Sequence, residues 1–321
     1  MMRKRIFCTL AVLLVFGGPV LAIAAGGKGE KRAAAPKFSG EDFRGIFSEP
    51  VNKIVKSDRP SAAAMRGAAS AAAAAAIAGG GESSGNAAGA NSWKTLISGQ
   101  SLEDEIKRMR LQYTKYVANP GEFKGGGYQD ASRELSIFGA LFGIIGEYDG
   151  DVRWKKDAPL ARDIFAQSSI DVEKASQTAF ATAQRRAQDL TDLTSGSGIA
   201  SNEKPEELDW SDDADRAYLM EYLEFLLNQQ LKPNSNNAAA VKANKAGLLR
   251  NAELVAAIGH LLVQEEMDDY DDEDYAAYSE LMKTAALEIV SALERDDADG
   301  IRKAVGKVDQ SCSKCHEDFR G

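Results

Sequence analysis

Beyond Trp93, apolar residues recur at spacings of three and four along the chain, which is the pattern of helices that bury one face. Breaks in this pattern fall at clusters of Gly, Pro, Asn and Asp, which favour turns. We therefore predict an all-α fold, whose first helix is capped by Ser101. The expected helices cover residues 101–118, 128–148, 159–169, 171–193, 212–231, 238–266, 272–295 and 298–319.

These expected helices fall into two similar sets of four, separated by a Ser- and Gly-rich break at residues 194–198. The two sets can be aligned so that Glu134 matches Glu253 and Ile144 matches Val263. We predict two tandem antiparallel four-helix bundles that are closed by short loops. Their expected bounds are residues 93–200 and 205–321.

The N-terminal residues have the pattern of a secretory signal. Three basic residues precede an apolar run over residues 6–16, and small residues follow at 22–24. The run is shorter than the roughly 20 residues that span a bilayer, so an uncleaved membrane anchor is the alternative interpretation. We predict a signal peptide at residues 1–24 that carries Cys8 away, and a periplasmic or otherwise exported protein without a transmembrane segment. Residues 25–92, rich in Ala, Gly and Ser, are predicted to form a disordered linker.

The charge of the chain restricts its partners. The sequence has 48 acidic and 39 basic residues, for a formal charge of −9. Removal of the signal peptide takes away three basic residues and no acidic one, which lowers this charge by three to −12. Such an acidic chain is not expected to bind a phosphate backbone, so nucleic acid is excluded as a partner. A partner protein with a basic patch, bound less tightly in high salt, is expected instead.

The candidate chemistry lies at the C-terminus, in the segment Cys312-Ser-Lys-Cys315-His316, which has the pattern of covalent c-type haem attachment. On a helix, residues three and four positions apart project from one side, so both thiols could bind haem while His316 reaches its iron as the proximal ligand. One such motif indicates one haem c per chain. The two cysteines also continue an apolar seam along the expected helix, formed by Ile301, Val305, Val308, Cys312, Cys315 and Phe319.

Two other interpretations of the cysteine pair compete with haem attachment. A zinc site would need two further ligands, for which His316 and either His260 or a carboxylate are available, but a second Cys-x-x-Cys is absent from the sequence. A thiol–disulfide exchange pair usually begins a helix that follows a strand. This pair instead ends the last helix of a chain predicted to be all-α.

The C-terminal segment resembles the class II cytochromes c, the cytochrome c′ and c-556 type. Residues 312–320 follow the ending Cys-x-x-Cys-His-x-x-aromatic-Arg of that family, and residues 275–286 resemble its preceding helix. The resemblance implies a four-helix bundle with haem attached near the end of the last helix. At the corresponding place in the first bundle, residues 189–196 contain neither Cys nor His, so that bundle is expected to bind no haem.

The sixth iron position has two candidates. The resemblance implies that the first helix of the haem bundle places a Met, a Leu or another apolar residue over the distal face, and Met220 occupies that position here. His260 is the other histidine of the chain and is the second candidate. By resemblance, Arg216 and Arg320 are candidates for contacts with the haem propionates.

These observations lead to one main functional hypothesis and two alternatives. The main hypothesis is an exported mono-haem c-type cytochrome that transfers electrons rather than an enzyme, since the sequence shows no distal acid–base pair. The first alternative is a five-coordinate haem protein that binds or senses a small gas such as nitric oxide. The second is a haem-free exported helical scaffold with a Cys/His metal site. A redox partner is expected, and a homodimer is compatible with the sequence.

Overall fold

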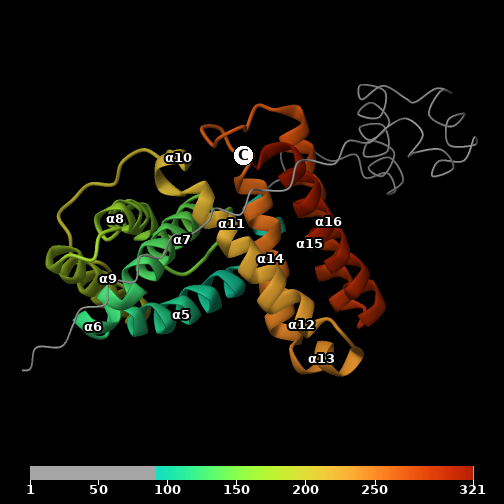
Figure 1. Ribbon diagram of the computed structural model, residues 1–321, viewed down its shortest axis with the longest axis horizontal. Coiled ribbons are helices and arrows are strands. Elements are labelled where there is room, and N and C mark those ends of the chain that lie inside the picture. Colours follow the sequence, from blue (N-terminus) through green and yellow to red (C-terminus); the bar gives the residue numbers. More distant parts are fainter. Residues whose placement is uncertain (1–91, 321) are drawn as a thin grey trace, which may run out of the picture. The chain divides into compact units, whose positions relative to one another are not determined.

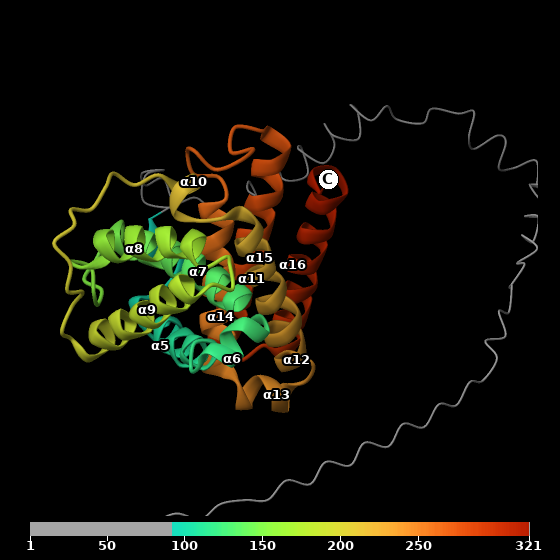
Figure 2. The same ribbon diagram turned by 60° about the vertical axis from the view of Figure 1, so that its left-hand side comes forward.

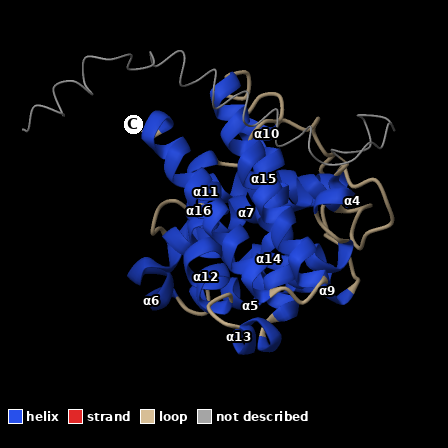
Figure 3. Cartoon of the chain, turned by 90° about the vertical axis from the view of Figure 1, so that its right-hand side faces the viewer, coloured by secondary structure: helices blue, strands red, loops and turns tan. Residues whose placement is uncertain are grey.

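A computed structural model of the protein describes residues 92–320, and every regular element in this range is helical (Figure 3). The predicted all-α fold is therefore confirmed. The predicted signal peptide, Cys8 and the linker up to residue 91 lie outside the described residues. None of the described helices is long and apolar enough to cross a membrane.

The long helices form two groups of four. The first helix group consists of α5 (Gly99–Tyr116), α7 (Tyr128–Gly146), α8 (Ala158–Asp171) and α9 (Gln177–Ser195). The second helix group consists of α11 (Arg216–Phe225) with its π-helical continuation η2 (Leu226–Leu231), α14 (Lys245–Leu261), α15 (Glu273–Glu294) and α16 (Ala298–Phe319). Figure 1 shows the first group from teal to yellow-green and the second from yellow to red. Short elements connect them: α4 (Trp93–Leu96), α6 (Pro120–Glu122), η1 (Phe123–Gly127), α10 (Trp210–Asp213), α12 (Lys232–Asn234) and α13 (Ala238–Ala243).

The two helix groups pack against each other. Helix α5 contacts α14, and α7 contacts α11, so that α11 lies between the first helix group and the rest of its own group (Figure 2). The buried apolar residues of both groups form one continuous cluster. The predicted division between residues 200 and 205 falls in an exposed connector without regular structure, at residues 196–209.

Side-chain caps explain several helix boundaries. Helix α5 begins before the predicted residue because Ser98, and not Ser101, is its N-cap: Ser98 Oγ accepts the backbone N–H of Ser101 at 3.2 Å. Ser176 caps α9 in the same way, which places the break before this helix at residues 172–176 and not at 170. Gly196 ends α9 in the left-handed conformation, with φ 91°, that glycine adopts without strain.

The single helix predicted over residues 238–266 is wrong. Asn244 interrupts it with ψ near 18°, and its side-chain amide donates to the carbonyl of Ala240 at 2.9 Å. A short polar side chain that competes for backbone groups favours such a break. The helix that follows, α14, ends at Leu261.

Helix α10 fixes the start of α11 on the first helix group. It lies on α7 where two glycines leave room: a Cβ at Gly139 would be 2.7 Å from the backbone oxygen of Asp213, and one at Gly143 would be 2.8 Å from the Trp210 ring. The carboxylate of Asp213 pairs with Arg162 of α8 at 3.0 Å, and both side chains are buried. These contacts of α10 with α7 and α8 fix the position at which α11 begins.

A buried carboxyl group in the first helix group gives a pH-dependent prediction. Glu134 on α7 is 8% exposed, and burial raises its pKa to about 8 against the attraction of Arg108 and Arg133. The folded protein therefore keeps a proton that the unfolded chain, with a pKa of about 4.3, releases. As a result, the free energy of unfolding should fall as the pH rises from about 4.3 to about 8.

We expect Glu134→Gln to remove this dependence and to raise the free energy of unfolding at pH 8 by on the order of a few kcal/mol, because the amide stays neutral at every pH and a difference of one pKa unit corresponds to about 1.4 kcal/mol. Urea unfolding at pH 5 and pH 8 measures both effects. Glu147→Gln, at an exposed position at the end of the same helix, is the control and should change neither value. An unchanged pH dependence in Glu134→Gln would contradict the prediction.

Candidate functional site: a cavity beside the C-terminal cysteines

A cavity of about 480 Å³ lies between the C-terminal half of α16 and the helix α11 with its continuation η2, and α15 closes it from one side. This volume lies within the range of about 300–1,000 Å³ that ligand pockets occupy. Six of the lining residues are those that the sequence predicted for the site: Arg216, Met220, Cys312, Cys315, His316 and Arg320. The fold therefore brings together residues that lie almost 100 positions apart.

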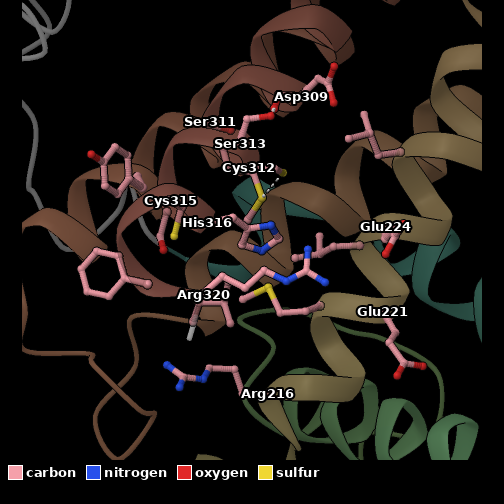
Figure 4. Close-up of a pocket in the computed structure, with 18 of the residues that line it drawn as sticks. Arg216, Glu221, Glu224, Asp309, Ser311, Cys312, Ser313, Cys315, His316 and Arg320 are labelled. Atoms are coloured by element: carbon pink, nitrogen blue, oxygen red, sulfur yellow. Dashed lines mark hydrogen bonds between the residues drawn. The ribbon is translucent and has the colours of Figure 1, made fainter. Parts of the chain in front are cut away.

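Helix α16 places both thiols and the imidazole on one side. It runs without a break from Ala298 to Phe319, as predicted, and Asp297 caps it by accepting the N–H of Gly300 at 2.9 Å. The predicted seam is confirmed: its first three residues are buried, and Cys312, Cys315 and Phe319 are partly buried against the core. Figure 4 shows Cys312, Cys315 and His316 projecting from this helix toward the cavity.

Contacts with α15 hold the end of α16 in place. The ring of Phe319 packs on Tyr275 and Tyr278, with ring centroids 5.2 and 6.4 Å apart. The Tyr278 hydroxyl donates to Asp318 at 2.8 Å, and Cys312 Sγ lies 3.9 Å from Met282 Sδ. The motif is thus held against α15, which also lines one side of the cavity.

The electrostatics of the two cysteines are those of protonated thiols. Neither cysteine is in a disulfide. Burial raises the pKa of the Cys312 thiol, and burial together with Cys312 and Asp318 raises that of Cys315 to about 11. Catalytic disulfide-exchange pairs show the opposite shift, toward a stabilised thiolate. This arrangement therefore argues against the thiol–disulfide exchange interpretation.

The wall opposite the cysteines is formed by α11 and η2. Met220, Leu223 and Leu227 line it with apolar surface, while Glu221 and Glu224 lie at its exposed edge (Figure 4). A π-helical segment inside an α-helix is frequent at functional sites, and η2 contributes Leu227 to this wall. Met220 is therefore placed across the cavity from the attachment motif.

Two arginines lie at one end of the cavity. Arg216 is paired with Asp269 at 2.5 Å and with Asp268 at 3.3 Å, and its guanidinium lies 5.9 Å from the centre of the Tyr275 ring. Arg320 follows the end of α16, and Figure 4 shows its side chain extending into the space between α16 and α11. The charge of Arg216 is thus largely compensated by carboxylates, whereas Arg320 presents its charge toward the cavity.

The other candidate for the distal position, His260, is not at the cavity. It lies on α14, with its ring 4.9 Å from that of Trp93 and its Nε2 3.2 Å from the Gln264 amide. Burial, with a contribution from Lys283, lowers its pKa. Between the two candidates for the distal position, the structure places Met220 and not His260 among the lining residues.

Several lining residues were not predicted from the sequence. Tyr275, Tyr278 and Met282 form the side wall on α15, where their spacing of three and four residues marks one helical face. Lys232 ties the end of η2 to Asp309 of α16 at 2.8 Å, one turn before the motif. The helical spacing on α15 is a usable signal in the sequence, whereas the pairing of Lys232 with Asp309 depends on the fold.

The comparison with known protein families agrees with this geometry. Residues 270–320 match the family model described as cytochrome C′. The C-terminal helical part of the chain is class II cytochrome c-like. The match covers α15 and α16 with the whole attachment motif, and it supports a covalently bound haem in this part of the chain. Neither the curated proteins nor the solved structures gave a significant match.

Among residues 92–320, no group of three or more His, Cys, Asp and Glu side chains is arranged to hold a metal ion. A zinc site of the usual kind takes four such ligands. At the cavity, the residues instead fit a covalently attached haem: two protonated thiols on one helical face, an imidazole beside them, an apolar opposite wall and an arginine at the edge.

Proposed function

We propose that the protein is an exported electron-transfer protein that carries one haem c in the cavity between α16 and α11. The proposal rests mainly on one observation: Cys312, Cys315 and His316 share one side of α16 and line a cavity whose opposite wall contains Met220. The family match over residues 270–320 supports the haem in this proposal.

Each residue has a separate task in this proposal. Cys312 and Cys315 would hold the haem covalently, each thiol adding its S–H across a vinyl group to give a thioether without loss of any atom. His316 would bind the iron through an imidazole nitrogen, and Met220 would offer a thioether sulfur or apolar surface from the opposite wall. Arg320 would pair with a haem propionate. Arg216 would do the same after giving up its ion pair with Asp268 or Asp269. A haem provides reversible one-electron chemistry, whose potential depends on axial ligands and burial.

Export and partner choice extend this proposal. Covalent haem attachment takes place outside the cytoplasm, the cytochrome c′ family is typically exported, and the predicted signal peptide would provide the route. An acidic mature chain would favour a redox partner with a basic patch.

The test of the haem proposal is the pyridine haemochrome spectrum of the purified full-length protein. We expect a c-type spectrum that survives acid–acetone extraction, with one haem per chain. A protein that loses all haem on extraction, or contains none, would overturn the proposal. Metal analysis of the same sample distinguishes the haem proposal from the haem-free scaffold, because a Cys/His metal site predicts zinc without iron.

Electron transfer and gas binding differ at Met220. A Met220 ligand would make the iron six-coordinate and low-spin, whereas an apolar distal wall of Met220, Leu223 and Leu227 would leave it five-coordinate and open to nitric oxide. We expect Met220→Leu to convert a low-spin spectrum to a high-spin one by electron paramagnetic resonance. A control at Leu227→Met, on the same wall, keeps the wild-type ligand. A high-spin wild type that Met220→Leu leaves unchanged would favour the gas-binding alternative.

A further inference from the structure

Helix α11 has two opposite faces with different neighbours. Ala217, Met220, Glu224 and Leu227 follow each other at spacings of three and four and line the cavity. Tyr218, Tyr222 and Phe225 have the same spacing on the other side, where they meet the first helix group. One face of α11 therefore lines the cavity, and its opposite face, which we call its back, packs on the first helix group.

The contacts on the back of α11 follow its whole length. At its start, the backbone N–H of Asp215 donates to Ser136 Oγ at 3.0 Å. One turn later, Tyr218 and Ser132 share a hydrogen bond of 3.1 Å between their hydroxyl groups. At its end, the guanidinium of Arg108 lies 5.5 Å from the centre of the Phe225 ring. These contacts come from α5 and α7, on which no residue lines the cavity.

A further contact on this face, between Tyr222 and Glu105, is buried. The hydroxyl of Tyr222 donates to Glu105 Oε1, and Glu105 is fully buried. Arg108 donates to the same carboxylate at 2.9 Å, and Arg250 of α14 pairs with it at 3.0 Å. Burial, reinforced by the charge of Glu105, raises the pKa of Tyr222 well above its ordinary value, so its hydroxyl remains a donor. Glu105 thus joins α5, α11 and α14 at one point.

We propose that the first helix group positions the distal wall of the cavity, and that Tyr222, held by Glu105, is its main positioning residue. Tyr222 lies two residues from Met220 on the opposite face, so a shift or rotation of α11 would move the Met220 side chain with it. This assigns a function to the first helix group, which lies outside the family match. That this wall faces a haem rests on the proposed function.

Tyr222→Phe removes the hydroxyl alone and tests this positioning in two ways. The first measurement is amide hydrogen exchange of the full-length protein, which needs no haem. We expect residues 216–231 to exchange about tenfold faster, because loss of one partner of a buried carboxylate shifts a local opening equilibrium by on the order of tenfold. The second measurement is the electron paramagnetic resonance spectrum of the haem-loaded protein, in which we expect a changed proportion of low-spin iron.

Tyr113→Phe is the matched control. Like Tyr222, Tyr113 is buried, and its hydroxyl makes one hydrogen bond, to the carbonyl of Ala183 at 3.0 Å; this bond joins α5 to α9 and not to α11. It should lower stability to a similar extent without faster exchange at residues 216–231 and without a change in the spectrum. Tyr218→Phe, at the other hydroxyl contact, should shift both measurements in the direction of Tyr222→Phe.

Three results would overturn the positioning role. Exchange of α11 could remain at the wild-type rate in Tyr222→Phe, or it could rise equally in Tyr113→Phe. Exchange could also rise in Tyr222→Phe alone while the spectrum stays that of the wild type. Tyr222 would then stabilise α11 without determining the position of Met220. If the wild-type protein holds no haem, the proposed function fails, but the exchange comparison still decides whether the first helix group holds α11.

Discussion

Replacement of both Cys312 and Cys315 by alanine is expected to give a folded protein that retains no covalently bound haem. The two thiols line the cavity from adjacent turns of α16, and the structure offers no other cysteine among residues 92–320. Both side chains are only partly buried, so the loss of packing should cost no more than about 1 kcal/mol for each, as is typical of point variants. The haemochrome absorbance after acid–acetone extraction should fall to background while circular dichroism stays helical.

The matched control for this variant is Ser313→Ala. Ser313 lies inside the motif and also lines the cavity, but it has no thiol to attach haem, and its hydroxyl donates to the carbonyl of Asp309, one turn earlier, at 2.9 Å. It should retain the wild-type amount of haem. Covalent haem in the double alanine variant at the wild-type level would contradict the assignment of the thiols. The loss of zinc, and not of iron, would indicate the metal-site alternative.

The C-terminal part of the site could be predicted from the sequence because its information is local. The spacing of Cys312, Cys315 and His316 defines one helical face, and the seam that begins at Ile301 defines the core-facing side of the same helix. Both features depend only on the helical repeat, so they survive in the fold with the same bounds, Ala298–Phe319. The same reasoning placed Met220 on an apolar stripe that does face the cavity.

The parts that could not be predicted depend on contacts between distant residues. His260 and Met220 were both acceptable distal candidates on helical stripes, and only the packing of α14 on α4 turns His260 toward Trp93. The π-helical segment η2 has no sequence signal that we could use. Helix α5 begins earlier than predicted because Ser98 caps it, and Asn244 interrupts the helix predicted over residues 238–266.

The junction at Glu105 is the most consequential of these distant contacts. Nothing in the pattern around Glu105 separates it from the partly exposed acidic residues of its own helix, since its partner Tyr222 is 117 positions away. In the fold, Glu105 is fully buried. Among the residues that the structure describes, its carboxylate is the one that pairs with both Arg108 and Arg250. A single carboxylate therefore faces two guanidinium groups where three helices meet.

Glu105→Ala is expected to lower the free energy of unfolding by about 3 kcal/mol, because breaking a buried ion pair leaves the remaining charges uncompensated. The variant leaves Arg108 and Arg250 facing each other, with side chains 34% and 22% exposed, and Tyr222 without its acceptor. Urea unfolding measures the loss as a lower midpoint at an unchanged slope.

Glu288→Ala provides the comparison, because Glu288 pairs with Lys307 at 2.6 Å on the surface of the second helix group, where both side chains are about half exposed. Pairs of this kind contribute about 0–1 kcal/mol, so this variant should unfold close to the wild-type midpoint. Equal losses in the two variants would show that Glu105 contributes no more than a surface charge. A loss of about 3 kcal/mol in Glu105→Ala alone would establish that the buried charge where α5, α11 and α14 meet stabilises the fold far more than a surface charge does.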